Sequence, residues 1–211
     1  MRNVLRKDEG DQCRLFNGQD GEWLYEITSL SKKKMQSTPL QQIREQPKSA
    51  APIILFFAPL KKTQTDWVVQ KATELGVTEI CPVTTDFSNT TKVRTDRWLS
   101  TAIEASEQSE RLTIPGISQL TNLRTALRNF PSSGVLNVAL ERMDGNILKC
   151  KYDTEHPCGL IIGPEGGFSD DEKQYFLSND RIHTFSLGEN VLRAETAAVV
   201  GLGLLKFSAA A

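Results

Sequence analysis

Apolar runs and turn-forming residues alternate along the chain and divide it into a short front segment and a longer body. In the front, residues 12–16 and 22–30 are rich in aromatic and β-branched side chains, and the turn-forming segment 17–21 joins them, which predicts a β-hairpin. The polar stretch 36–51 holds two prolines and predicts a strand end followed by a linker. The front is therefore expected to be a small β module with little core of its own.

From residue 53 onward, strand-length apolar runs alternate with helical patterns. The run 53–58 is continuously apolar, as expected of a strand that is buried on both faces. The segment 66–75 has apolar residues at helical spacing and ends before Gly76, a good helix terminator. Further strands are predicted at 79–83, 135–140, 159–163 and 182–187, and further helices at 95–110, 122–130, 170–179 and 193–207. Strands that alternate with helices predict an α/β fold with a mainly parallel sheet.

Composition excludes several classes of protein. The 211 residues are 39% hydrophobic and 24% charged, which is ordinary for a globular protein, and no apolar stretch approaches the roughly 18 residues of a membrane helix. The N-terminus carries charges where a signal peptide would be apolar, so we expect a cytoplasmic protein with reduced thiols. The four cysteines form no C-x-x-C pair and only two histidines are present, so no metal site is expected.

The charge is distributed unevenly, although the net charge is only −1. Residues 1–62 hold eleven Lys and Arg against seven acids, so the front carries +4 and the remainder −5. A basic front on an acidic body suggests a segment that meets a polyanion, with a solvated surface of chance asymmetry as the alternative.

A glycine-rich loop follows the predicted strand 159–163. Residues 163–168 read GPEGGF, and three glycines in six residues allow a ligand to approach the backbone closely. Ser169 and Glu172 then match the capping box of a helix N-terminus. The loop fits neither a P-loop nor G-x-G-x-x-G. It therefore predicts a different ligand site at the carboxyl edge of a parallel sheet, or a plain structural turn.

A second loop, residues 186–197, also leaves a predicted strand and enters a helix. Gly188 again permits close approach of a ligand to the backbone. Glu195 near the helix N-terminus is favourable to the helix dipole whatever its function, whereas the Arg193 cation opposes the dipole. Arg193 therefore needs a carboxylate or a substrate oxygen as its partner. The helix beyond is nearly all apolar, which predicts burial, and Gly201 and Gly203 would let another backbone pack close.

The segments GPEGGFSDDE (163–172) and SLGENVLRAETAAVVGL (186–202) closely resemble the C-terminal signature of the 16S rRNA uridine-N3 methyltransferases, the RsmE family of the SPOUT class. Further similar segments at 66–77, 104–109, and 4–6 together with 15–18 extend the resemblance over nearly the whole chain. The resemblance implies a SPOUT-type α/β domain with a C-terminal deep trefoil knot at residues 51–211. It also implies a PUA-like, RNA-binding β domain at residues 1–50, inside which the chain is expected to begin, so that this domain is N-terminally incomplete.

The same resemblance implies S-adenosyl-L-methionine as the cofactor, held largely by backbone groups of three loops. These are the end of the strand 135–140 and the two loops described above. The residues expected to contact the cofactor are Leu140, Ile162, Gly163, Pro164, Gly166, Gly167, Ser186, Leu187, Gly188, Leu192, Thr196 and Ala197.

The implied reaction transfers a methyl group to N3 of uracil, which is a poor nucleophile while it is protonated. The site must therefore remove the N3 proton or stabilise the resulting anion. Arg193 is expected to hold the uracil oxygens as negative charge develops. Glu165 or Glu195 is expected to be the general base.

The resemblance also implies partners. The expected substrate is 16S rRNA or the small ribosomal subunit, and the family's members are typically homodimers with the active site at the interface. Side chains of the basic front are expected to contact phosphates. They are Arg2, Arg6, Lys7, Lys32, Lys33 and Lys34.

Three other functions are weighed against this one. Ribose 2′-O methyltransferases of the SPOUT class carry a Ser-Leu-Asn-Val-Ser run where this chain has residues 192–197, so they are disfavoured. A hydrolase is disfavoured because no G-x-S-x-G motif is present. A non-catalytic RNA-binding or ribosome-assembly protein with the same fold stays open.

Overall fold

The computed structural model describes residues 7–32, 34–48, 51–90, 92–141 and 155–208. The chain divides into two compact units, Met1–Lys48 and Ser49–Ala211. Three of the residues predicted to contact RNA, Arg2, Arg6 and Lys33, lie outside the described residues.

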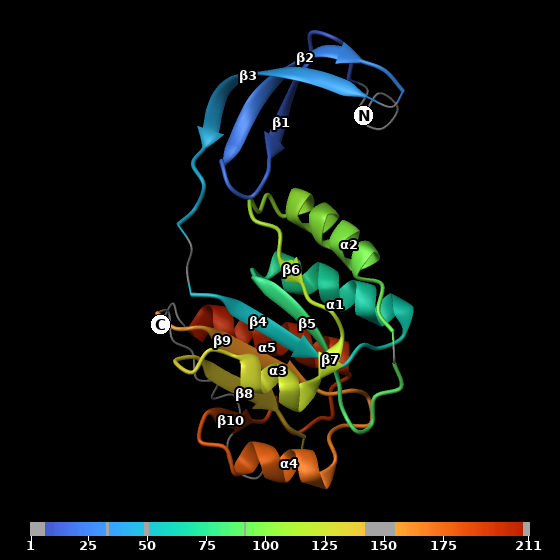
Figure 1. Ribbon diagram of the computed structural model, residues 1–211, viewed down its shortest axis with the longest axis vertical. Helices are drawn as coiled ribbons and strands as arrows, with labels where there is room; N and C mark the ends of the chain where they lie inside the picture. The colour runs from blue at the N-terminus through green and yellow to red at the C-terminus, as the bar shows by residue number, and fades with distance from the viewer. Residues whose placement is uncertain (1–6, 33, 49–50, 91, 142–154, 209–211) are drawn as a thin grey trace. The chain divides into compact units, whose positions relative to one another are not determined.

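The first unit is a three-stranded antiparallel sheet with the strand order β1-β2-β3 (Figure 1). Strands β1 (Gln12–Phe16) and β2 (Glu22–Leu30) form the predicted hairpin. In their connection, the Asn17 Oδ1 atom accepts hydrogen bonds from the backbone N–H groups of Gln19 and Asp20, both at 2.9 Å. An Asn side chain that closes the backbone in this way is a common reason why Asn marks a turn.

The third strand, β3 (Met35–Arg44), corrects the prediction of a linker over residues 36–51. It pairs with β2 along its length, but most of its residues are exposed, so it lacks the apolar alternation that reveals a strand. Pro39 is tolerated because β3 lies at the edge of the sheet. Among the described residues of this unit, Ile27 is the only buried hydrophobic one, which agrees with the small core expected.

The second unit is built on a parallel sheet with the strand order β10-β8-β9-β4-β5-β6, and β7 pairs with β5 (Figure 1). Its strands are β4 (Ile53–Phe57), β5 (Glu79–Thr84), β6 (Gly116–Ile117), β7 (Thr121–Asn122), β8 (Val135–Ala139), β9 (Cys158–Ile162) and β10 (Ile182–Phe185). Its helices are α1 (Lys62–Glu74), α2 (Thr95–Gln108), α3 (Leu123–Asn129), α4 (Asp170–Leu177) and α5 (Ala194–Ser208). The α/β class with a mainly parallel sheet is confirmed. The two-residue strands β6 and β7 were not predicted, because two residues carry no periodicity.

Helices cover both faces of this sheet, so the central strands are buried on both sides. In β4, Leu55 and Phe57 belong to one hydrophobic cluster, which includes Val69 of α1 and Leu205 of α5. The alternate residues of β4 belong to a second cluster, which includes residues of α3 and α4. This arrangement explains the continuous apolar run of β4, because each face of a doubly covered strand needs apolar side chains.

Helices α1 and α2 pack against each other and end in the same way. After α1, Gly76 has a φ of +92°, and its N–H donates to the Thr73 carbonyl at 3.0 Å. After α2, Glu110 has a φ of +53°, and its N–H donates to the Glu107 carbonyl at 3.3 Å. Both ends are Schellman motifs, which favour glycine at the left-handed position.

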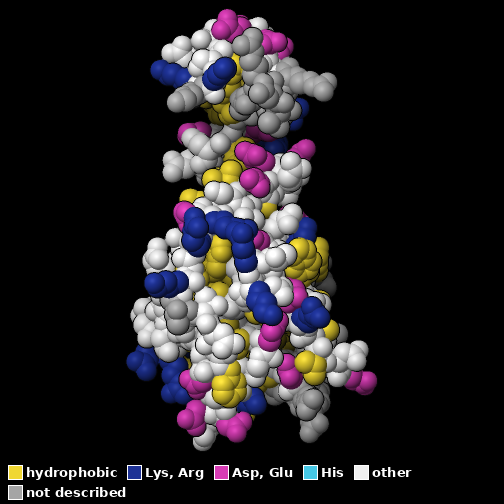
Figure 2. Space-filling view, turned by 90° about the vertical axis from the view of Figure 1, so that its right-hand side faces the viewer, with side chains coloured by type: hydrophobic (Ala, Val, Ile, Leu, Met, Phe, Trp, Pro, Cys, Tyr) yellow, Lys and Arg dark blue, Asp and Glu magenta, His cyan; other side chains and the backbone are white. Residues whose placement is uncertain are grey.

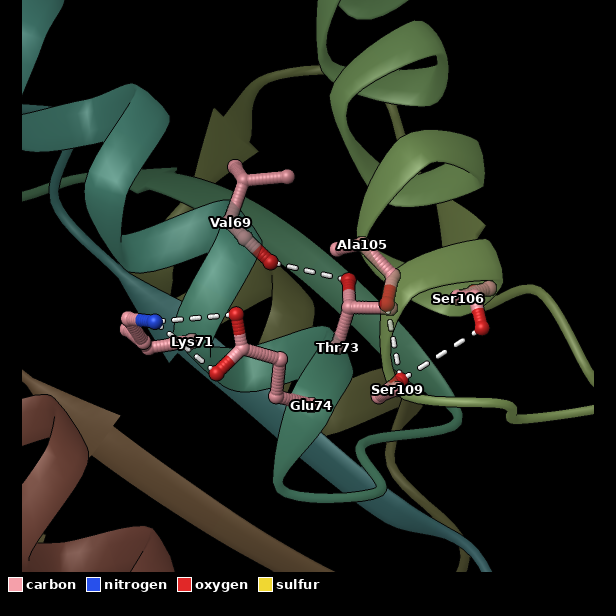
Figure 3. A network of polar contacts seen from close by, with 7 residues as sticks. All are labelled: Val69, Lys71, Thr73, Glu74, Ala105, Ser106 and Ser109. Carbon is pink, nitrogen blue, oxygen red and sulfur yellow. Dashed lines mark hydrogen bonds and ion pairs between the residues drawn. The ribbon is translucent and has the colours of Figure 1, made fainter. Parts of the chain in front are cut away.

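Side chains reinforce these two helix ends (Figure 3). In α1, the Thr73 hydroxyl donates to the Val69 carbonyl at 2.8 Å, and in α2 the Ser109 hydroxyl donates to the Ala105 carbonyl at 2.7 Å. The Arg111 guanidinium connects the two regions, because it donates to the carbonyl of Thr73 at 2.7 Å. Burial lowers the pKa of Arg111 to about 10. These hydrogen bonds therefore hold the C-terminal ends of α1 and α2 together.

The described ranges contain neither a membrane-spanning helix nor a metal-binding cluster. Within those ranges, no helix combines the length and the apolar character needed to cross a membrane. The same part of the chain contains no group of three or more His, Cys, Asp or Glu side chains arranged to hold a metal ion.

Candidate functional site

A cleft of about 980 Å³ opens at the carboxyl ends of the adjacent strands β10, β8 and β9. The loops that follow β9 and β10 line it, together with the first residues after β8 and the N-terminal part of α5. The volume lies at the upper end of the range of ligand sites in proteins. The position, at the carboxyl edge of a parallel sheet, is the one that the two glycine loops predicted.

The loop after β9 exposes its backbone to the cleft because of its glycines. Gly163 packs against the ring of Phe168, and a Cβ atom at Gly163 would lie 2.9 Å from that ring. Gly167 has a φ of +72°, and its N–H donates to the Pro164 carbonyl at 2.9 Å. The conformation at Gly167 and the packing at Gly163 therefore both require a residue without a side chain.

The predicted capping box at the start of α4 is confirmed. The Ser169 hydroxyl accepts a hydrogen bond from the Glu172 N–H at 3.2 Å, and the Glu172 carboxylate accepts one from the Ser169 N–H at 3.0 Å. The capping box fixes the end of the glycine loop, because it holds the first turn of the helix that follows.

The loop after β10 is held by one of its own side chains. The Ser186 hydroxyl donates to the Gly188 carbonyl at 3.1 Å and accepts from the Gly188 N–H at 3.3 Å. Gly188 has a φ of +117°, a conformation that L-residues with side chains rarely adopt. Ser186 therefore shapes this loop, and it also lines the cleft.

Eleven of the twelve residues predicted to contact the cofactor line this cleft. They are Leu140, Ile162, Gly163, Pro164, Gly166, Gly167, Ser186, Leu187, Gly188, Leu192 and Ala197. Thr196 is exposed and is not among the lining residues. It precedes Ala197 by one position on α5, and one position turns a helical side chain by about 100° away from its neighbour.

The three predicted catalytic residues occupy different environments. Arg193 and Glu165 line the cleft and are exposed, and the side chain of neither makes a hydrogen bond or ion pair with the described residues. Glu195 lies in the first turn of α5 and does not line the cleft. Its Oε2 atom is buried and finds no hydrogen-bond partner among the described residues. The structure therefore brings together Arg193 and Glu165, but not Glu195.

Several residues of the cleft were not predicted. Lys61 and Gln64 come from the start of α1, and Lys173 and Leu177 come from α4. They reach the cleft only through the packing of their helices beside the sheet, which local patterns do not reveal. A cation at the very start of a helix, as at Lys61, is unfavourable to the dipole and is the one local signal that could have indicated a ligand there.

The predicted RNA contacts within the described residues lie in the first unit. Lys32 and Lys34 are exposed in the connection between β2 and β3, where the Lys34 N–H donates to the Ser31 hydroxyl at 3.0 Å. Lys7 is partly exposed and precedes β1. The two lysines at the hairpin tip are therefore open to a polyanion.

Two family models match the chain. A model described as an RNA methyltransferase domain matches residues 47–206, and one described as an RNA methyltransferase PUA domain matches residues 1–40. The Ribosomal RNA small subunit methyltransferase E of Rickettsia conorii is 33% identical over 207 residues, which cover 98% of this chain and 84% of that relative.

Two solved structures share the fold over nearly the whole chain. The Ribosomal RNA small subunit methyltransferase E of Neisseria gonorrhoeae, bound to S-adenosyl methionine, matches with a TM-score of 0.88 and 26% identity, over 98% of this chain and 87% of that one. A methyltransferase from Legionella pneumophila, in complex with the same cofactor, matches with a TM-score of 0.84 and 30% identity, over 98% of this chain and 87% of that one.

Proposed function

This chain belongs to the RNA methyltransferase family, and on that premise we propose that it transfers a methyl group from S-adenosylmethionine to N3 of a uridine in 16S ribosomal RNA. The observation that carries the proposal is the cleft formed by the two glycine loops, which lies in a fold shared with cofactor-bound methyltransferases. The N3 position follows from the close resemblance of residues 163–172 and 186–202 to the uridine-N3 family.

The residues of the cleft fit the cofactor. Gly167 and Gly188 hold left-handed backbone conformations, and a Cβ atom at either would meet nothing within 4 Å in the part of the chain that the structure describes. Because these two positions carry no side chain, a ligand can approach the main chain of both loops closely. Leu140, Leu187 and Leu192 supply the apolar walls that a ligand site of this kind uses. We also propose that these loops belong to a trefoil knot.

S-adenosylmethionine supplies an electrophilic methyl group on a sulfonium, and its sulfur keeps the electron pair of the broken C–S bond. The chain must generate the attacking nitrogen lone pair. Glu165, exposed in the cleft, would accept the N3 proton as general base. Arg193, which also lines the cleft, would hold the uracil oxygens, on which negative charge develops as the proton leaves.

RNA binding and assembly complete the proposal. Lys7, Lys32 and Lys34 would contact phosphates from the first unit, as would Arg2, Arg6 and Lys33, which lie outside the described residues. The chain would act as a homodimer on 16S rRNA or the small subunit, in the cytoplasm where ribosomes are assembled. Leu177 and Val191, at the rim of the cleft, are 64% and 55% exposed, and a second copy would cover them.

Reverse transcription tests the reaction directly. N3 methylation blocks the Watson–Crick edge of uracil, so primer extension should stop one nucleotide before the modified base after incubation with small subunits from a strain that lacks the endogenous enzyme. Absence of the stop would refute the reaction. If calorimetry also shows no heat with S-adenosylmethionine at high concentration, a non-catalytic RNA-binding or ribosome-assembly protein is favoured. A modification that leaves primer extension intact at normal nucleotide concentration would favour a ribose methyltransferase.

A further inference from the structure

Phe87 is an exposed aromatic residue beside the cleft that the proposed reaction leaves unused. It lies between β5 and α2 and is 50% exposed, whereas Phe56, Phe57, Phe168, Phe176 and Phe185 of the same unit are buried. Hydrophobic side chains reach the surface of this unit only as small, separate patches on the face that Figure 2 shows. Phe87 therefore differs from the core phenylalanines of this unit, and it lies next to a ligand site.

Hydrogen bonds hold the loop that carries Phe87. Thr85 and Ser88, on either side of Phe87, are joined twice: the Thr85 N–H donates to the Ser88 hydroxyl at 2.8 Å, and the Ser88 N–H donates to the Thr85 carbonyl at 3.1 Å. The Asp86 N–H donates to the Glu172 carboxylate at 3.1 Å, and the Ser169 hydroxyl donates to the Asp86 carboxylate. The capping box of α4 thus anchors this loop, so the Phe87 backbone is fixed before any ligand binds.

The ring of Phe87 stands against the glycine loop of the cleft. A Cβ atom at Gly166 would lie 3.5 Å from the Phe87 Cβ atom and 4.0 Å from its ring atoms Cγ and Cδ2. Gly166 lines the cleft and is itself exposed, next to Glu165, the proposed base. Phe87 thus lies beside the loop that lines the cleft, although it is not itself a lining residue.

We propose that Phe87 is the stacking platform for an unpaired pyrimidine base of the RNA, the one that is to be methylated. The inference rests on the proposed function. An enzyme that modifies a base must take it out of the helical stack, and single-stranded bases are held by stacking on aromatic side chains. Stacking uses the face of the base and leaves its edge, which carries N3, free to point into the cleft. Because the loop is already fixed, little ordering cost opposes the contact.

Substitutions that separate stacking from packing test this role. Phe87→Ala and Phe87→Leu remove the aromatic face, and leucine keeps most of the apolar volume, whereas Phe87→Tyr keeps the ring. The control is Phe207→Ala, at the far end of α5, where the phenylalanine is 64% exposed. Each variant is assayed for KM and kcat on small subunits, for subunit binding with S-adenosylhomocysteine present, for S-adenosylmethionine affinity by calorimetry, and for mass by light scattering.

Subunit binding and KM should differ between the variants that keep the aromatic ring of Phe87 and those that lose it. Phe87→Ala and Phe87→Leu should weaken subunit binding and raise KM by roughly tenfold to a hundredfold, whereas Phe87→Tyr and Phe207→Ala should stay within about threefold of the wild type. Cofactor affinity, melting temperature and mass should not change. Full binding by Phe87→Leu would overturn the inference in favour of packing, and a change in mass would overturn it in favour of a protein contact.

The measurement of subunit binding distinguishes a failure of this inference from a failure of the proposed reaction. If the wild type binds subunits without methylating them, and Phe87→Ala weakens that binding, the reaction fails while the base contact stands. If the wild type methylates subunits and Phe87→Ala binds them equally well, the base contact fails while the reaction stands.

Discussion

The side chain of Arg193 stands just before α5, where its cation opposes the helix dipole, and it pairs with none of the described residues. Replacing it should therefore cost little stability and should remove charge stabilisation from the reacting uracil. We expect Arg193→Ala to lower kcat by about a hundredfold or more, the usual loss when one such donor is removed. S-adenosylmethionine affinity should stay within about twofold, since the contacts expected to the cofactor are mainly to backbone groups.

The matched control is Arg128→Ala, which removes another exposed arginine from the last turn of α3. It should leave kcat unchanged. Unchanged turnover in Arg193→Ala would exclude Arg193 from the chemistry, and a parallel loss of cofactor affinity would make it a cofactor-binding residue instead.

Glu165 and Glu195 differ in their access to the cleft, and this difference separates them as candidates for the general base. Glu165 lines the cleft, whereas one carboxylate oxygen of Glu195 is buried and finds no partner among the described residues. Glu165→Gln should lower kcat by roughly a hundredfold or more and should flatten the acidic limb of the pH–rate profile. Glu195→Gln should keep that limb, because the wild-type base would still be present.

Loss of the acidic limb in Glu195→Gln, with an intact limb in Glu165→Gln, would reverse the assignment. Melting temperatures of both variants serve as the control, since Glu195 also lies where a carboxylate favours the helix dipole.

Residues of the site could be predicted from the sequence where they act through their own backbone, and could not where they reach the cleft through tertiary packing. Gly163, Gly167 and Gly188 act through their own backbone, so composition and local order were enough to place them at the cleft. Lys61 reaches the cleft, and Phe87 its edge, only because distant segments fold beside the glycine loops, and neither was predicted. Thr196 does not line the cleft for a related reason, because its motif fixes its position in the sequence but not the side of α5 on which it falls.

At the scale of the elements, substitution by alanine should have opposite effects on stability at two glycines, one just after a helix and one inside a helix. Gly76 ends α1 at a φ of +92°, whereas Gly203 lies inside α5, where a Cβ atom would meet nothing within 4 Å in the part of the chain described. Gly76→Ala should lower the free energy of unfolding by about 1 kcal/mol, because alanine is strained in the left-handed region. Gly203→Ala should raise it by up to about 1 kcal/mol, because alanine favours the helix.

Urea unfolding of both variants, read by circular dichroism, measures this pair. A loss of stability in Gly203→Ala would mean that another backbone does pack against it, as the sequence suggested. Gly201 is different, since a Cβ atom there would lie 2.9 Å from Leu160 of β9.

How well each element could be predicted depended on its burial. Strand β4 is covered on both faces, and the helix α2 on one, so their apolar patterns are clear and their positions were predicted to within a few residues. Strand β3 belongs to a sheet with almost no core, and its register rests on backbone hydrogen bonds, which any sequence can make. In the second unit, the elements predicted most closely are thus those whose side chains are buried, whereas the β1–β2 hairpin was predicted from its turn residues and its aromatic and β-branched strands.

For the molecule as a whole, RNA phosphates are proposed to bind the first unit and the cofactor to bind the second. Substitutions at the tip of the β2–β3 hairpin test this assignment. Lys32→Ala combined with Lys34→Ala should weaken subunit binding and reduce its salt dependence, by roughly one to two in the slope of log affinity against log salt concentration. Lys48→Ala, which removes another exposed lysine of the same unit, is the control. S-adenosylmethionine affinity should be unchanged; an unchanged salt slope would remove these lysines from the phosphate contacts.

The proposed homodimer places a second requirement on the molecule, because Leu177 and Val191 expose large apolar side chains at the rim of the cleft. If a second copy covers them, a charge at Leu177 must be buried on association, and such burial costs several kcal/mol unless the charge is paired. Leu177→Glu should therefore reduce the mass measured by light scattering from that of two chains to that of one. Turnover should fall with it, since the cleft would lose one wall.

Leu99→Glu, at a 44% exposed position on α2, should change neither quantity. A dimer that survives Leu177→Glu would place the interface elsewhere, whereas a fully active monomer would show that one chain holds the complete site.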